Sequence, residues 1–146
     1  MAKTKAHTAY KLKDGTRVKG VTTILSNLGW NKNVLVAWAR RTALAGDDPD
    51  AVLKEAGAIG TLAHYLCECD IKGEEPELDD YSAEQIEKAE NAFLGYLEWK
   101  KMTKPKYEAI ELKMVSEKYR VGGTADFVAR INNSLVLGDI KTSKGI

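Results

Sequence analysis

The feature that most constrains the fold is a change in hydrophobic period at Lys104-Pro105. Between residues 82 and 102 the apolar residues recur every three or four positions, as on one face of a helix. Over residues 110–114 and 125–131 apolar and polar residues alternate instead, as in half-buried strands. Helices followed by strands predict an α+β fold with N-terminal helices and a mostly antiparallel sheet.

Turn and capping signals predict where the individual elements begin and end. The first twenty residues predict a hairpin of Tyr10–Leu12 and Val18 around an Asp14-Gly15 turn. Ser82 and Gln85 form a capping-box pattern, and the acidic stretch before it is a predicted loop. The remaining predicted elements are helices from Thr22 or Thr23 to Gly29, from Asn33 to Gly46, from Asp48-Pro49, and from Ile59 through His64 to Gly73, and a last strand from Ser134 to Lys141.

Length and composition fit one folded domain. The chain has 146 residues, of which 44% are hydrophobic, so we expect a single domain over 1–146, mainly helical over 1–105 and stranded over 106–146. Cys67 and Cys69 are too few for a disulfide scaffold and are expected to be small core residues. Val34, Leu35, Trp38 and Leu44 are expected to supply buried side chains. Because neither a secretory signal nor a membrane-spanning run is seen, we expect a cytoplasmic protein with no membrane partner.

Charge is distributed unevenly along the chain. Residues 1–41 carry nine Lys or Arg and one acid, residues 42–100 carry four bases and 15 acids, and residues 101–146 carry nine bases and five acids. Two basic segments flanking an acidic one would give a positive face that attracts phosphate backbones, if the fold keeps the signs apart. If folding intersperses them, the surface is an ordinary one.

The register of the last strands brings carboxylates together. Asn132-Asn133 is suited to a two-residue hairpin turn, since Asn tolerates positive φ. That turn sets Asp126 opposite Asp139, with Lys141 two residues further along the same face. A second turn centred on Lys118-Tyr119 would set Glu111 opposite Asp126. A bulge at Gly122-Gly123 would instead send Glu111 to the other face.

Carboxylates placed this closely suit a divalent cation. Directly opposed like charges destabilise a sheet, and side chains in such pairs have Cβ atoms roughly 4.5–5.5 Å apart. Such carboxylates share protons or bind a cation, and hard oxygen ligands favour Mg²⁺ or Mn²⁺. With the Lys141 ammonium on the same face, this set suits a metal ion acting on a phosphodiester.

These residues resemble the core of the PD-(D/E)XK nuclease superfamily. The resemblance rests on Gly-Thr-Ala-Asp at residues 123–126, followed by Asp-Ile-Lys-Thr-Ser-Lys at residues 139–144. Gly-Thr-Leu-Ala-His at residues 60–64 is similar to the upstream Gly-Thr-x-x-His motif of the RecB-type branch. That branch includes CRISPR-adaptation nucleases, mitochondrial genome-maintenance exonucleases and phage nucleases. The resemblance implies a restriction-endonuclease-like core, with residues 106–146 as its catalytic strands.

The resemblance also implies a role for each matching residue. Asp126 and Asp139 would bind the metal, the carbonyl of Ile140 and the imidazole of His64 would be further ligands, and Lys141 would be the catalytic lysine. Glu111 takes the place of an acid that related nucleases often have before the core hairpin. The candidates for contacts with DNA are Thr142, Ser143, Lys144, Arg40 and Arg41.

The expected function is therefore Mg²⁺- or Mn²⁺-dependent hydrolysis of DNA, exonuclease-like, by an enzyme encoded by a bacterium or a phage. The alternative is a DNA-binding or assembly module that keeps the nuclease fold without turnover. The family continues into a helix with a Gln-x-x-x-Tyr motif, whereas this sequence stops at Ile146. We therefore expect an incomplete core, a core that a homo-oligomer completes, or a fragment of a longer chain. We expect no iron–sulfur cluster, because two cysteines do not supply its four ligands.

Overall fold

The computed structural model describes residues 9–29 and 32–142. Within these residues the chain forms four helices and a five-stranded mixed sheet with β5 paired to β4 and the other strands in the order β1-β2-β4-β3. This confirms the α+β class. None of the helices in the described ranges is both long and apolar enough to cross a membrane.

The chain divides into two compact units. Unit 1 comprises residues 57–112 and 125–142 of the described chain, and unit 2 comprises residues 9–56 and 113–124 without residues 30–31. Helix α3 (Pro49–Lys72) and the strands β3 (Lys106–Ser116) and β4 (Val121–Ile131) contribute residues to both units.

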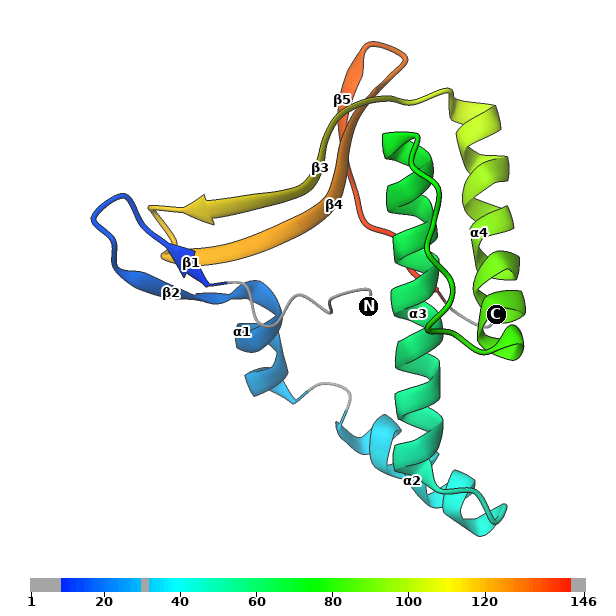
Figure 1. The fold of residues 1–146 in the computed structure, drawn as a ribbon. Coiled ribbons are helices and arrows are strands. Elements are labelled where there is room, and N and C mark those ends of the chain that lie inside the picture. Colours follow the sequence, from blue (N-terminus) through cyan, green and yellow to red (C-terminus); the bar gives the residue numbers. More distant parts are fainter. Residues whose placement is uncertain (1–8, 30–31, 143–146) are drawn as a thin grey trace. The chain divides into compact units, whose positions relative to one another are not determined.

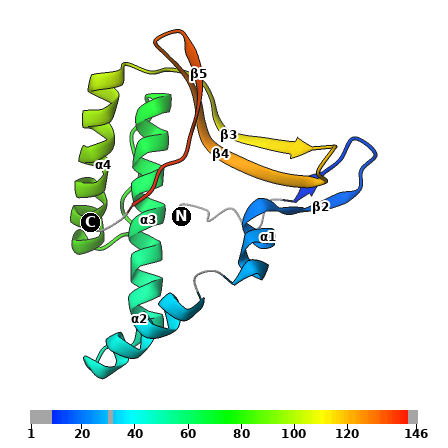
Figure 2. The ribbon, with the colours of Figure 1, turned by 180° about the vertical axis from the view of Figure 1, so that it is seen from behind.

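Unit 1 packs two helices side by side, α3 from residue 57 onwards and α4 (Ala83–Thr103), as Figures 1 and 2 show from opposite sides. Its core cluster consists of Leu62, Ala63 and Leu66 of α3 and Ala89 of α4, with Phe93 and other partly buried residues against it. Ala125 and residues 127–129 of β4 are buried as well. The helical spacing of apolar residues in α4 therefore serves packing against α3.

Local signals set the ends of α4. The Ser82 hydroxyl accepts the Gln85 N–H, and the Gln85 side chain accepts the Ser82 N–H, which confirms the predicted capping box. At the other end, Lys104 adopts a left-handed conformation with φ of 47°, and its N–H bonds the Lys100 carbonyl. Pro105 then prevents the helix from continuing.

The hairpin of β4 and β5 (Ser134–Gly138) has the predicted turn and register. Asn132 and Asn133 both have positive φ, 49° and 64°, as a two-residue hairpin turn of this kind requires. Pairing runs from Ile131 with Ser134 to Phe127 with Gly138. The paired strand ends at Gly138, three residues earlier than predicted, and an extended segment of residues 139–142 follows without strand pairing.

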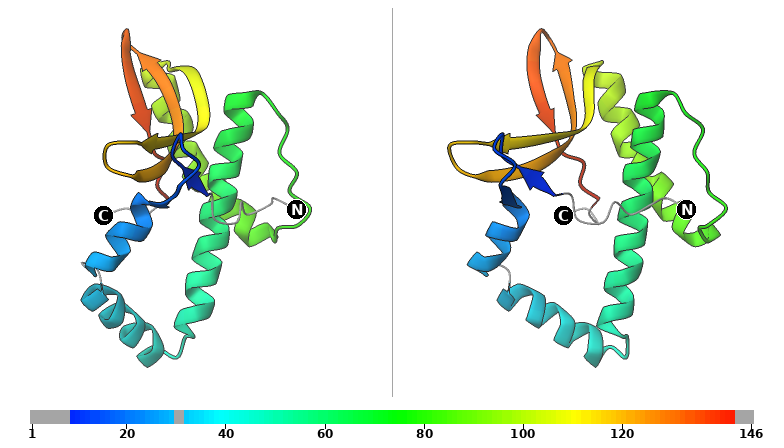
Figure 3. Two further views of the ribbon diagram at one scale, coloured as in Figure 1. Left: turned by 90° about the vertical axis from the view of Figure 1, so that its left-hand side faces the viewer. Right: turned by 60° about the vertical axis from the view of Figure 1, so that its left-hand side comes forward.

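Unit 2 contains β1 (Tyr10–Lys11), β2 (Arg17–Gly20), α1 (Val21–Leu28) and α2 (Lys32–Leu44), drawn in blue to cyan in Figure 3. The predicted hairpin is present, with Tyr10 paired to Val18, and Gly15 in its turn has φ of 85°. Helix α1 begins at Val21, and its N-cap residue Gly20 provides no side-chain cap, so the predicted cap at Thr22 or Thr23 is wrong. Strand β2 pairs in parallel with β4 at residues 121–122, an exception to the expected antiparallel sheet.

Two further predictions about helices are wrong. The predicted third and fourth helices are one continuous helix, α3, because Gly57 and Gly60 lie within it without ending it, and Gly73 with φ of 71° ends it. Helix α2 was expected to bury Val34, Leu35, Trp38 and Leu44, but Val34, Leu35 and Leu44 are exposed and Trp38 is half-buried. Val34, Leu35 and Trp38 share one side of the helix, but Val36 and Leu44 lie on others, so one face could not bury all five.

Candidate functional site

Asp126 connects β4 to the segment after β5. The Ile140 N–H donates a hydrogen bond of 2.5 Å to Oδ2 of Asp126, whose side chain is 21% exposed. The observed pairing ends with Phe127 and Gly138, directly beside Asp126 and Asp139. The predicted strand pair of Asp126 with Asp139 is not part of the observed pairing, because the paired strand ends one residue earlier. A side-chain-to-backbone bond brings the segment after β5 to Asp126 instead.

His64 approaches Asp126 from α3. Its Nδ1 lies 3.8 Å from Oδ2 of Asp126, which is within ion-pair range and beyond hydrogen-bond range. The His64 side chain is 38% exposed, so it remains accessible to solvent. The helical motif and the strand acid, predicted from separate parts of the sequence, therefore lie together.

These residues line a small cavity of about 30 Å³ within unit 1. His64, Glu111, Asp126 and Ile140, all predicted as site residues, border it together with Glu68. Glu68 was not predicted, although it follows His64 by four residues and so shares its helix face. It pairs with Lys72 one turn further along α3.

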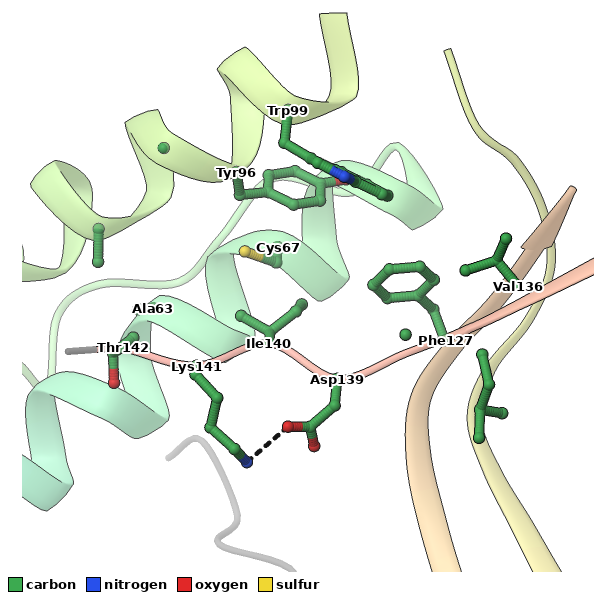
Figure 4. Close-up of a pocket in the computed structure, with 14 residues that line it drawn as sticks. Ala63, Cys67, Tyr96, Trp99, Phe127, Val136, Asp139, Ile140, Lys141 and Thr142 are labelled. Atoms are coloured by element: carbon green, nitrogen blue, oxygen red, sulfur yellow. Dashed lines mark ion pairs between the residues drawn. The ribbon is translucent and has the colours of Figure 1, made fainter. Parts of the chain in front are cut away.

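Asp139 and Lys141, the residues on either side of Ile140 in the chain, form an ion pair. Lys141 Nζ lies 2.6 Å from Oδ2 of Asp139, and both side chains are largely exposed, 79% for Lys141 and 56% for Asp139. The hydrogen bond to Asp139 raises the pKa of Lys141, and the nearby charges of Asp139 and Asp126 act in the same direction. Figure 4 shows both side chains on one side of the 139–142 segment and Ile140 on the other. Lys141 is thus held as a cation at the carboxylates.

On the side to which Ile140 points, a larger pocket of about 460 Å³ contains three aromatic rings (Figure 4). The Trp99 ring lies 5.5 Å from that of Phe127 and 6.2 Å from that of Tyr96. Cys67 lies on its wall, and burial, with smaller contributions from Asp70 and Asp126, raises the pKa of its thiol to about 12. Both cysteines are buried free thiols, as predicted.

A polar network next to these rings was missed by sequence reasoning. Oδ2 of Asp70 accepts hydrogen bonds from the Tyr96 hydroxyl at 2.8 Å and from Lys100 Nζ at 2.6 Å. The hydroxyls of Tyr96 and Tyr107 are 2.9 Å apart. Burial raises the pKa of Tyr96, so its hydroxyl stays protonated and can donate. Because its members come from three elements, the network connects α3, α4 and β3 in unit 1.

The Gly-Thr-x-x-His motif has a steric role in addition to supplying His64. A Cβ atom on Gly60 would lie 3.1 Å from Oγ1 of Thr142, closer than ordinary van der Waals contact. Glycine at this position therefore lets the segment carrying Asp139 and Lys141 run close to α3.

The predicted DNA contacts are distributed over both units and the undescribed end of the sequence. Thr142 is exposed beside Gly60, and Ser143 and Lys144 lie outside the described residues. Arg40 and Arg41 lie on α2 in unit 2.

A closed metal site is not present among residues 9–29 and 32–142: no three His, Cys, Asp or Glu side chains are grouped to hold an ion. No family model, curated protein or solved structure matches the chain. Function must therefore be inferred from the side chains themselves.

Proposed function

We propose that this chain is a divalent-metal-dependent DNA nuclease with a restriction-endonuclease-like core of the PD-(D/E)XK type. The observation that supports it most is convergence: His64, Glu111, Asp126 and Ile140, from four separate segments, border one cavity. The ion-paired Asp139 and Lys141 are the chain neighbours of Ile140. Ordinary surface carboxylates have no reason to gather in this way, since like charges repel.

The donor chemistry fits Mg²⁺ or Mn²⁺. Asp126 and Asp139 would hold the ion through carboxylate oxygens, with the Ile140 carbonyl and His64 as further ligands; imidazole is a better ligand for Mn²⁺ than for Mg²⁺. In the structure these groups have other partners, because Asp126 accepts the Ile140 N–H and Asp139 pairs with Lys141. A bound ion would supply charge neutralisation at the phosphate and a more acidic water.

Lys141 would provide the second positive charge. Its raised pKa keeps the amine protonated, so it can donate hydrogen bonds to a phosphate oxygen or to the attacking water. Because the side chain is exposed, it can reach a phosphate bound at the surface. Asp139 positions it through the 2.6 Å contact.

Incubating labelled single- and double-stranded DNA with the protein tests this proposal. We expect cleavage with Mg²⁺ or Mn²⁺, none with EDTA, and a loss of about 100-fold or more in Lys141→Ala, which removes a charge from the reacting centre. Lys101→Ala is the matched control, because it removes an exposed lysine of unit 1 that lies outside the site. Absence of metal-dependent cleavage, or equal cleavage by Lys141→Ala, would refute a nuclease function.

Among the described residues no group of three ligands is present, which favours the alternative, a DNA-binding or assembly module without turnover. Melting temperature separates the two functions, since an ion that binds only the folded protein stabilises it. A nuclease predicts that Mn²⁺ raises the melting temperature of the wild type and not of Asp139→Asn. A module predicts DNA binding without cleavage and without a Mn²⁺ effect in either protein.

A further inference from the structure

The hairpin of β1 and β2 carries a row of cations in unit 2. Lys11, Lys13, Arg17 and Lys19 are all exposed, and they alternate with Tyr10, Leu12 and Val18, which turn inward. Tyr10 packs against Gly122, and its hydroxyl lies 2.9 Å from that of Thr124. One face of the hairpin is therefore fixed to β4, and the other presents the four cations.

The register places two of these cations in direct opposition. Lys11 pairs with Arg17 across the hairpin, so their side chains leave the same face next to each other. Directly opposed like charges destabilise a sheet. Among the described residues neither forms an ion pair within 4.0 Å of a carboxylate, which leaves this repulsion without compensation inside the unit.

The turn between β3 and β4 extends this surface. Oε1 of Glu117 accepts the Lys13 N–H at 2.8 Å, so the turn lies beside the hairpin, as Figures 1 and 3 also show. The turn brings Lys118, Arg120 and Tyr119, whose ring is 71% exposed, with Lys118 Nζ 5.1 Å from the ring centroid. We call the surface that these two tips form the hairpin surface. Its residues are Lys11, Lys13, Arg17, Lys19, Lys118, Tyr119 and Arg120.

The two acids at these tips, Asp14 and Glu117, already accept hydrogen bonds from the backbone. Glu117 accepts the backbone N–H of Lys13, and Asp14 accepts that of Thr16 at 2.8 Å. The Thr16 hydrogen bonds, with a smaller effect of Arg120, hold the pKa of Asp14 below its usual value. Both carboxylates thus serve turn geometry.

Charge differs in sign between the units. Among the described residues, unit 2 has 11 Lys or Arg and six Asp or Glu, a net charge of +5, whereas unit 1 has eight and 15, a net charge of −7. Six of the 11 cations of unit 2 belong to the hairpin surface.

We propose that the hairpin surface binds the phosphate backbone of DNA, with Tyr119 available to stack on an unpaired base. Its chemistry fits a nucleic acid better than a protein, because protein interfaces are depleted of Lys at their centre and need apolar side chains there, whereas the only large apolar group of this surface is one aromatic ring. Phosphates would neutralise the opposed Lys11 and Arg17, and base–aromatic stacking is tolerant of sequence. The choice of DNA as the polyanion rests on the proposed function; the surface itself lies outside the carboxylate site.

The test measures DNA affinity over a range of salt concentrations in EDTA, by fluorescence anisotropy, so that no cleavage occurs. Lys11→Gln/Arg17→Gln should weaken binding about tenfold or more near 0.1 M salt and reduce the slope of log affinity against log salt by about 2, since each phosphate contact contributes roughly 0.9. The matched control Lys101→Gln/Lys106→Gln removes equal charge from exposed positions of unit 1 and should change the affinity less than about twofold. Tyr119→Ala should weaken binding of single-stranded DNA roughly 5- to 100-fold, and Tyr119→Phe should not.

Equal losses in the two double variants would show that net charge alone matters and would overturn the proposal. Unchanged DNA affinity together with loss of self-association, measured by sedimentation, would assign the surface to the acidic unit of a second copy and would also overturn it. Absence of cleavage in the nuclease assay would refute the enzyme and leave this measurement unaffected.

Discussion

The two units differ in where their apolar side chains lie. Eleven of the twelve buried hydrophobic side chains of the described chain belong to unit 1, and Leu12 is the one from unit 2. Most of the exposed large hydrophobics belong to unit 2, on α1, on α2 and at the start of α3. Unit 1 therefore has a core of its own, and its stability can be measured through that core.

The difference matches a division of chemical roles. Unit 1 combines the packed core, net negative charge and the carboxylate site, and a site of this kind needs rigid support for its side chains. Unit 2 presents cations and apolar groups to solvent, features that serve contact with other molecules.

The comparison is tested most strongly by removing one leucine from each unit. Leu62 is fully buried in the core of unit 1, whereas Leu44 on α2 is 77% exposed. Leu62→Ala should lower the free energy of unfolding by about 2–5 kcal/mol, because it leaves a cavity. Leu44→Ala should change it by less than about 0.5 kcal/mol. Urea unfolding followed by circular dichroism measures both, and similar losses would contradict the assignment of the core to unit 1.

A pH series sharpens the same comparison through Cys67. Burial raises its pKa from an ordinary 9.0 to about 12 in the folded chain, so the unfolded thiol ionises first. The protonated Cys67 thiol therefore contributes fully to the free energy of unfolding below pH 9, and this contribution is lost as pH rises towards 12. The loss amounts to about 2 kcal/mol at pH 10.5. The fall in unfolding free energy between pH 8 and pH 10.5 should be smaller by this amount in Cys67→Ala. An equal fall in the two proteins would show that Cys67 is not protected in the core.

The elements with local signals were predictable from the sequence. The change of period at residues 104–105 separated helix from strand, Ser82 and Gln85 capped α4, and Asn132-Asn133 set the β4–β5 register. Each depends on residues close together in the chain, so neighbouring sequence was sufficient. The sequence predicts a boundary in α3 near Gly60, but glycine serves there to let Thr142 of a distant segment approach the helix.

The register of β3 shows why the site was only partly predictable. A turn centred on Lys118-Tyr119 pairs odd residues of β3 with even residues of β4. At the other end of β3, Glu108 binds Arg130 at 2.9 Å and the Tyr107 ring contacts that of Phe127. Here even-numbered residues of β3 contact even-numbered residues of β4, and odd-numbered residues contact odd-numbered ones. Between the two ends Glu111 has φ of 51°, which interrupts the extended backbone and changes the register. No residue type in this part of the sequence predicts such a break.

The smallest effect concerns how helices begin in the two units. Helix α4 of unit 1 starts with a capping box at Ser82, and α1 of unit 2 starts after Gly20 without a side-chain cap. Ser82→Ala should therefore cost about 1 kcal/mol in urea unfolding, because the Gln85 N–H loses its acceptor. Thr22→Ala should leave stability unchanged or raise it slightly, since Thr22 lies inside the first turn, where alanine has the higher helix propensity. A loss near 1 kcal/mol in Thr22→Ala would restore Thr22 as a cap and remove this difference between the units.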